Sequence, residues 1–415
     1  MAIDTIIINC LLEGKKELSC VFIEQGRFVK FLDQKELLPS QLQDVEMIDA
    51  KGQLMLPPLV ETHVHLDKAC IFSRCELHKG TLSEAIEQTA NAKANFDYED
   101  VYIRGKKVIE KAIKQGTSYM RTHVEIDPVI GLTGFRAIQQ LKQDYAWGIT
   151  LSLCVFPQEG LHNNEGTHEL LEQALQSGAD LLGGCPYTDS LPEKQIETLF
   201  ELANKYDVDL DFHLDFDLDS NHMLLPHVIE MTKKYNYKHR VTVGHVTKLS
   251  TIPMDKLAVI AQEMAIAGVH LTALPSTDLF LMGREFDHNI PRGVAPLMPL
   301  TKAGVNCSIS SNNIENPFTP YGDCSQVRQA NLFANIAQLA TKKELVQCLD
   351  WVSSDSALLM RMDDYGIAVN HSADAIFFPV RERAEIIATI QPPSFGIKSG
   401  KITFSRDDTH LYPPK

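Results

Sequence analysis

Short apolar runs alternate with segments of helical spacing through most of the chain. Apolar residues at i, i+3 and i+4 predict helices over residues 191–207 and 251–268. Unbroken apolar runs predict eight buried strands, within residues 54–67, 117–127, 149–160, 179–187, 208–217, 240–249, 269–277 and 305–313. Eight strand–helix units in series predict an α/β fold, a parallel (β/α)8 barrel of the TIM type. A doubly wound open sheet is the alternative, but no Gly-rich phosphate-binding fingerprint supports it.

Short strands are also predicted near both ends of the chain. They fall within residues 4–12, 18–31, 52–58, 373–379 and 396–404. We therefore expect a small β-sandwich domain formed by residues 1–55 together with residues 366–415. Residues 56–365 would form the barrel.

Composition and charge narrow the classes of function. The 415 residues are 44% apolar and 22% charged, which is ordinary for a globular protein, and the net charge is −15. That charge argues against nucleic acid and against anionic membrane surfaces as partners. The nine cysteines form no CxxC pair, and no apolar run reaches the ~18 residues that a membrane helix needs. With no secretory leader visible, we expect a cytoplasmic protein that does not associate with membranes.

A barrel of this type carries its chemistry at the C-terminal ends of its strands, and histidines lie there. His63 and His65 are two residues apart in one strand, so both imidazoles face the same side. His213 ends the fifth strand. Three neutral imidazoles are enough to hold a catalytic metal ion with an open position. We expect these three residues to be metal ligands.

Three further residues lie at strand ends. His245 ends the sixth strand and would face the reacting water as a proton shuttle or electrophile. His123 ends the second strand, and either it supports the ligands from behind or its role is only structural. Gln158 follows the third strand, where its amide could hold the edge of an amide-like heterocycle or simply cap a helix.

Several stretches together resemble one known family. They are VETHVHLDK, GTLSEAIE, MRTHVEID, VFPQEG, DFHLD, VTVGHVT and DDYGIAVNHSADAIFFP. In this order and spacing they resemble the cytosine deaminase-like branch of the amidohydrolase superfamily, and they are also similar to N-isopropylammelide amidohydrolase. The resemblance implies a barrel with a small β-domain from both termini and one divalent metal ion, Fe²⁺ or Zn²⁺. It also implies metal binding by His63, His65 and His213, catalysis by His245 and ring binding by Gln158.

The chain departs from that family at two carboxylates. Phe216 stands where the family has a proton-transferring glutamate, and Asn312 stands where it has a metal-binding aspartate. The resemblance then places Asn312 as a fourth metal ligand and Asn313 as a substrate-binding residue. Asp215 and Asp217 both continue the alternation from His213, so either could be a compensating catalytic carboxylate, and Asp215 is our candidate.

The expected function is hydrolysis of a C–N bond, other than a peptide bond, in a small nitrogen heterocycle such as a pyrimidine or triazine. Water activated by the metal ion would be the nucleophile. The alternative is a degenerate barrel that binds a small ligand with little or no turnover, because both carboxylates have changed. The partner is a small heterocyclic molecule in either case, and the resemblance makes a homo-oligomer plausible.

Overall fold

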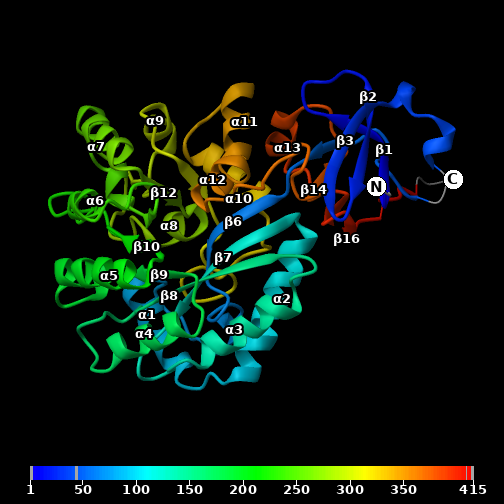
Figure 1. Ribbon diagram of the computed structural model, residues 1–415. Coiled ribbons are helices and arrows are strands. Elements are labelled where there is room, and N and C mark those ends of the chain that lie inside the picture. Colours follow the sequence, from blue (N-terminus) through cyan, green and yellow to red (C-terminus); the bar gives the residue numbers. More distant parts are fainter. Residues whose placement is uncertain (1–2, 43–44, 408, 413–415) are drawn as a thin grey trace.

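The structure is a computed structural model that describes residues 3–42, 45–407 and 409–412. Its larger part is a barrel of eight parallel strands in sequential order (Figure 1). These strands are β6 (Leu59–Val64), β7 (Thr117–Glu125), β8 (Thr150–Phe156), β9 (Leu181–Gly184), β10 (Asp209–Leu214), β11 (Val241–His245), β12 (Val269–Ala273) and β13 (Cys307–Ile309). The predicted (β/α)8 barrel and its eight strands are confirmed.

Asn312 joins the last strand segment to the first. Its backbone N–H donates to the carbonyl of His63, and its carbonyl accepts from the N–H of His65, both at 2.9 Å. The chain after β13 is thereby bridged to β6 across the gap in the sheet. Three residues expected to bind metal therefore lie side by side on adjacent backbone at one end of the barrel.

Helices cover the outside of the barrel and fill its connections. They are α1 (Leu82–Lys93), α2 (Tyr98–Lys114), α3 (Thr133–Asp144), α4 (Thr167–Gln176), α5 (Pro192–Tyr206), α6 (Leu225–Lys234), α7 (Met254–Ala267), α8 (Pro275–Leu281), α9 (Leu297–Lys302), α10 (Gln326–Ile336), α11 (Lys342–Asp350), α12 (Ser354–Leu359) and α13 (Arg383–Thr389). Short 3₁₀ turns occur at η1 (Gln34–Glu36), η2 (Pro39–Leu42), η3 (Phe72–Arg74), η4 (Pro186–Thr188) and η5 (Thr247–Ser250). Helices α5 and α7 confirm the two helices predicted from apolar spacing. Helix α7 ends at Gly268, whose φ of +70° gives the left-handed cap that glycine favours.

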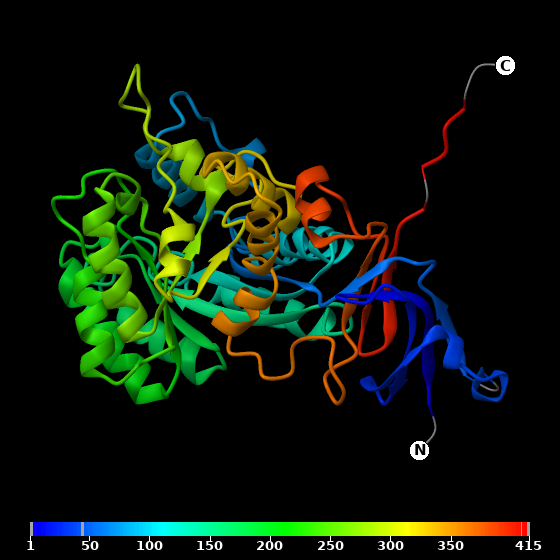
Figure 2. The same ribbon diagram turned by 90° about the horizontal axis from the view of Figure 1, so that it is seen from above.

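Strands from both ends of the chain form a second, mixed sheet. Its order is β16-β15-β14-β5-β1-β2-β3, and β4 pairs with β1. The strands are β1 (Thr5–Leu12), β2 (Leu18–Glu24), β3 (Arg27–Asp33), β4 (Glu46–Asp49), β5 (Leu54–Leu56), β14 (Ala375–Phe378), β15 (Phe395–Lys398) and β16 (Lys401–Ser405). Both views place this sheet at one side of the barrel (Figures 1 and 2). The predicted joining of the two termini in one small β-structure is confirmed.

The terminal sheet shares its apolar core with the barrel. Along β5 and β14 the side chains alternate between two clusters. Leu54, Leu56 and Phe378 belong to the barrel core, whereas Met55 and Phe377 belong to the core of the sheet. This alternation follows from the two-residue period of strands, so the two strands form a seam between the units.

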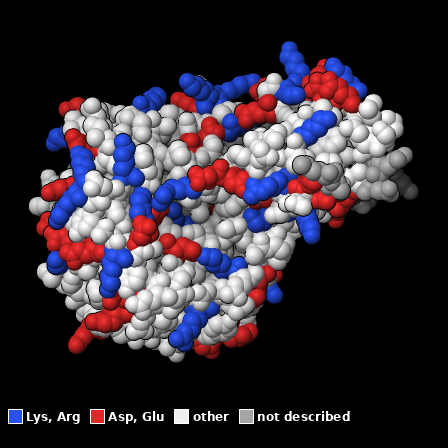
Figure 3. Space-filling model, in the orientation of Figure 1, with Lys and Arg blue, Asp and Glu red and all other residues white. Residues whose placement is uncertain are grey.

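The surface carries charged side chains of both signs (Figure 3). Lys, Arg, Asp and Glu side chains are mixed over the face that Figure 3 shows, rather than gathered into one basic area. Among the described residues, no helix combines the length and apolar character needed to cross a membrane.

Candidate metal centre and its surroundings

The three predicted histidine ligands converge at the C-terminal end of the barrel. The Nε2 atom of His213 lies 3.0 Å from Nε2 of His63 and 3.1 Å from Nε2 of His65. Ligand atoms placed at about 2.0–2.1 Å around a tetrahedral ion lie roughly 3.3 Å apart. The separation of the nitrogens is therefore close to what an ion would require.

The electrostatic setting of these rings also suits a cation. All three side chains are at most 2% exposed, and burial lowers the pKa of each imidazole well below its usual range. Among the described residues, the Nδ1 atoms of these three rings have no hydrogen-bond partner. Neutral rings that bring three Nε2 atoms together are the donor set of a metal site. The histidine group therefore forms a candidate metal site.

A second set of possible donors overlaps the first. It consists of His63, His123 and Asp211. The rings of His63 and His123 are stacked, with centroids 3.8 Å apart and planes inclined by 24°. Lone pairs of stacked rings lie in nearly parallel planes and do not converge between them. Asp211 is also paired with Arg121 at 2.7 Å. The stacking places His123 against His63, and whether His123 supports a metal ligand or is only structural stays a prediction.

His245 lies next to the histidine group and has a polar partner on each nitrogen. Its Nδ1 is 2.6 Å from Oδ1 of Asp278, a buried carboxylate on α8. Its Nε2 is 3.4 Å from Nδ2 of Asn312. The network assigns the proton to Nδ1, donated to Asp278, and leaves Nε2 to accept from the amide. Sequence reasoning missed Asp278, because nothing marks a helical aspartate 33 residues from His245 as its partner.

The two positions that lack the family carboxylates both contact His245. The ring of Phe216 lies 3.9 Å from the imidazole, centroid to centroid. Asn312 donates to Nε2, and its own Oδ1 is buried with no partner among the described residues. Phe216 is only 2% exposed and packs with Ala85, Leu281 and Phe318 in an apolar cluster. This cluster therefore forms an apolar cover over His245, at the position where the resemblance leads us to expect a proton-transferring glutamate.

Asp215 is engaged in helix capping. Its two carboxylate oxygens accept hydrogen bonds from the backbone N–H groups of Leu224 and Leu225, at 2.9 and 3.0 Å. These groups begin α6, where unpaired donors need acceptors. Strand alternation would place Asp215 on the same face as His213. It does not hold here, because the backbone of Asp215 is left-handed, with a φ of 49°. The compensating catalytic role expected for Asp215 thus competes with this structural one.

Asn313 lies beside the site and is held by a neighbour. Its Oδ1 accepts a hydrogen bond of 2.7 Å from Nδ2 of Asn316, which also donates to the carbonyl of Lys68 at 3.3 Å. Asn313 is 3% exposed. The pair therefore ties the loop after β13 to the backbone that follows the histidines of β6.

Gln158 is paired with a buried lysine, Lys68. Nζ of Lys68 donates to Oε1 of Gln158 and to Oε1 of Glu125, both at 2.8 Å. The amide nitrogen of Gln158 donates to the sulfur of Cys185 at 3.3 Å. Lys68 is 2% exposed and also lies over the ring of Phe318, 4.5 Å from its centroid. A lysine that also pairs with Glu125 thus contacts the predicted ring-binding amide.

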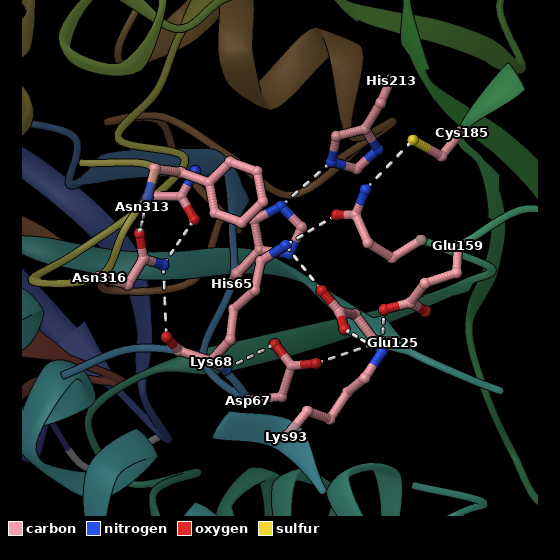
Figure 4. Close-up of polar contacts among 12 residues, drawn as sticks. His65, Asp67, Lys68, Lys93, Glu125, Glu159, Cys185, His213, Asn313 and Asn316 are labelled. Atoms are coloured by element: carbon pink, nitrogen blue, oxygen red, sulfur yellow. Dashed lines mark hydrogen bonds and ion pairs between the residues drawn. The ribbon is translucent and has the colours of Figure 1, made fainter. Parts of the chain in front are cut away.

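Lys93, from the last turn of α1, neutralises a cluster of carboxylates behind Lys68. Its Nζ lies 2.9 Å from Oε2 of Glu125 and 2.5 Å from Oδ2 of Asp127, and it is also paired with Glu159 (Figure 4). These three carboxylates lie close enough to hold an ion, but the ammonium group already fills that place. Burial and the neighbouring carboxylates raise the pKa of Glu159 to about 7, whereas Lys68 and Lys93 hold that of Glu125 at about 2 despite its burial.

A cavity lies on the outer side of the apolar cover. Its volume is about 390 Å³, and Phe216 is part of its wall. The remaining lining comes from the start of α1, from the two residues after Phe216, and from the end of α8 with the segment that follows it, including Thr81, Leu281 and Arg284. Because Phe216 also contacts His245, its ring stands between this cavity and the histidines.

Comparison with known proteins agrees with the geometry. N-isopropylammelide isopropyl amidohydrolase of Pseudomonas sp. (strain ADP) is 27% identical over 385 residues, which cover 90% of each chain. Pterin deaminase of Rhizobium rhizogenes is 25% identical over 374 residues, covering 89% of this chain and 85% of the other. The crystal structure of 5-methylcytosine deaminase from Klebsiella pneumoniae, liganded with 5-fluorocytosine, matches with a TM-score of 0.92, 26% identity and 99% coverage of both chains.

The family itself is settled by a match over most of the chain. The sequence profile of the amidohydrolase family matches residues 107–404, which include His213, His245 and Asn312. The chain therefore belongs to the amidohydrolase family.

Proposed function

We propose that this protein is a metal-dependent hydrolase that cleaves a C–N bond of a small nitrogen heterocycle. The observation that carries the proposal is the convergence of three neutral imidazoles at the C-terminal end of the barrel, where Nε2 of His213 lies 3.0–3.1 Å from Nε2 of each of the other two. Relatives that act on N-isopropylammelide, pterin and 5-methylcytosine support a pyrimidine, triazine or pterin ring as the substrate.

His63, His65 and His213 would hold one divalent ion, iron or zinc, and Oδ1 of Asn312 is available as a fourth donor. Such an ion would act as a Lewis acid toward water and toward the ring. The remaining steps of binding and proton transfer belong to side chains of the barrel.

His245 is placed to handle the proton of the attacking water. With Nδ1–H donated to Asp278, its Nε2 is the basic nitrogen, and its hydrogen-bond partner is the amide nitrogen of Asn312 at 3.4 Å. Asp278 would then stabilise the imidazolium that forms, as a carboxylate behind a catalytic histidine does. Asn312 holds the ring in this orientation.

Gln158 and Lys68 would orient the ring. The fixed amide of Gln158 has donor and acceptor capacity suited to the edge of an amide-like heterocycle. The ammonium group of Lys68 adds hydrogen-bond donors at the same edge. Asn313, on the loop after β13, completes the proposed binding residues.

One observation favours the alternative, a barrel that binds without turnover. Phe216 transfers no proton, and general acid–base groups typically contribute about 10²–10⁴-fold to rate. Asn312 cannot act as a base, so the usual route through these two positions is absent.

Metal analysis and a substrate panel separate the two functions. Protein purified without added metal should contain close to one equivalent of iron or zinc, and His213→Asn should lose most of it. His162→Asn is the control, since that loop histidine pairs with Asp189 away from the triad. Release of ammonia or an amine from a pyrimidine, triazine or pterin supports the hydrolase. A metal-free protein that is inactive across the panel would support the degenerate barrel.

A further inference from the structure

We propose that the ligand of this site is an anion, namely a small heterocycle that bears a carboxylate or an ionised ring oxygen. Its negative charge would face the histidine group and Lys68. The inference rests on the proposed metal centre, and it names the substrate class more narrowly than the proposed function does.

The first argument is the charge of the donor set. Three imidazoles and the amide of Asn312 are all neutral, so none of these donors offsets the two charges of a divalent ion. A buried cation is costly unless an anion accompanies it. Phe216, on the adjoining wall, adds no charge either. The missing charge is therefore most simply supplied by the bound molecule.

The second argument is that nearby carboxylates are already committed. Asp211 is paired with Arg121 at 2.7 Å, and Asp278 accepts from His245 at 2.6 Å. Glu125 is shared between Lys68 and Lys93. Moving any of them to the metal would leave a buried cation or imidazole without its partner, which costs several kcal/mol.

Asp67 is committed as well. Its Oδ1 accepts from the backbone N–H of Lys68, and its Oδ2 accepts from that of Glu125, at 2.9 and 2.8 Å. This carboxylate thus braces the turn after the histidines and faces backbone donors.

The third argument is the lysine itself. Nζ of Lys68 has three donors, of which two are used by Glu125 and Gln158. Figure 4 shows the Lys68 side chain extending from the turn after His65 toward the Glu125 carboxylate. The third N–H remains for a ligand that also reaches the histidines.

The test compares matched rings on protein loaded with zinc. Orotate and 5-carboxyuracil carry a carboxylate that their neutral parent uracil lacks. Titration calorimetry should show at least one of the two acids binding roughly tenfold or more tightly than uracil to the wild type. Because coupling between two ligands is reciprocal, the acid should tighten zinc binding, in a competition with a chelator, by the same factor by which zinc tightens binding of that acid relative to the metal-free protein.

Asn312→Asp supplies the missing negative charge, so it should abolish the preference for the acid while retaining zinc. Asn306→Asp is the matched control, because it makes the same change at the opposite end of β13, where Nδ2 of Asn306 donates to the carbonyl of Asp355. This variant should keep the preference. Lys68→Met should reduce it.

Two results would overturn the inference on a zinc-loaded protein. One is uracil binding as tightly as both acids, and the other is an unchanged preference in Asn312→Asp. Either would leave the proposed hydrolase intact if a neutral ring is turned over. A wild type that binds no zinc would overturn the metal centre and this inference together, whereas binding of the acids without turnover would sustain the inference and count only against the hydrolase.

Discussion

One buried lysine, Lys93, holds the acidic groups behind the site in place. Lys93 is 3% exposed and contacts three carboxylates that come from two different strand ends. Lys93 shares Glu125 with Lys68. It also pairs with Glu159, the residue that directly follows Gln158. The arrangement at the substrate edge therefore depends on a residue that does not itself reach the histidines.

Lys93→Met should destabilise the fold strongly. It leaves Glu125, Asp127 and Glu159 close together without their shared cation, and breaking a buried pair in this way typically costs about 3–5 kcal/mol. Urea unfolding at neutral pH measures the loss. Lys194→Met, which removes a pair between exposed side chains, should have little effect. Equal stability of the two variants would show that the cluster is solvated rather than buried.

Glu159 should give the protein a dependence of stability on pH. Its pKa is raised from about 4.5 to about 7 in the folded state, so the native protein binds more protons than the unfolded chain between these values. Stability should therefore fall as pH rises through this window. In Glu159→Gln, the decrease in the free energy of unfolding across this pH window should be smaller than in the wild type by about 1–3 kcal/mol. Urea unfolding between pH 5 and 8 checks this, with the exposed Glu165→Gln as a control that should follow the wild type.

At the level of elements, strand ends position the histidines of the site, whereas some polar side chains just beyond a strand end cap the next helix. β6 ends one residue before His65, β10 ends one residue after His213, and β11 ends at His245. The residue two positions after His213 turns away, because the strand has ended and Asp215 serves α6. A side chain just beyond a strand end cannot be assigned to a face by alternation alone.

Asp215→Ala tests which role dominates. Loss of a capping carboxylate should lower the free energy of unfolding by about 1–2 kcal/mol, with the metal content unchanged. Asp219→Ala, in the same loop, removes a local turn contact and should cost much less. Turnover should survive in Asp215→Ala after correction for unfolded protein. If Asp215→Asn retains stability yet loses all turnover, the catalytic role is correct instead.

Features of the fold and the site that depend on local sequence patterns could be predicted, whereas contacts between residues far apart in the sequence could not. The eight strands and the triad were predictable, because period, strand end and spacing are local signals that the barrel brings together. The pairings of Lys93 with Glu125 and of His245 with Asp278 span 32 and 33 residues and carry no local pattern. The branching of β1, which pairs with β4 through Thr5–Ile8 and with β5 through Leu11 and Leu12, likewise depends on tertiary packing.

At the scale of the whole molecule, the seam at β5 and β14 makes the two sheets depend on each other. Phe378 is fully buried in the barrel core although its strand belongs to the terminal sheet. Tyr365, on the segment that leads from α12 to β14, donates to the carbonyl of Pro58 at 2.7 Å, so the two chain segments that connect the sheets are also tied to each other. Removing either unit would expose apolar side chains that have no other cover.

The chain should therefore unfold as one cooperative unit. Calorimetry of the metal-loaded protein should show a single endotherm, and removal of the ion by a chelator should lower the temperature of the entire transition, because binding in the barrel stabilises everything coupled to it. Phe378→Ala should shift the same single transition downward, at a cost of about 3–5 kcal/mol. Ile402→Ala, on the exposed edge strand β16, should shift it little, since that side chain is 53% exposed. Two endotherms, of which the chelator moves only one, would show that the terminal sheet is energetically separate despite the shared core.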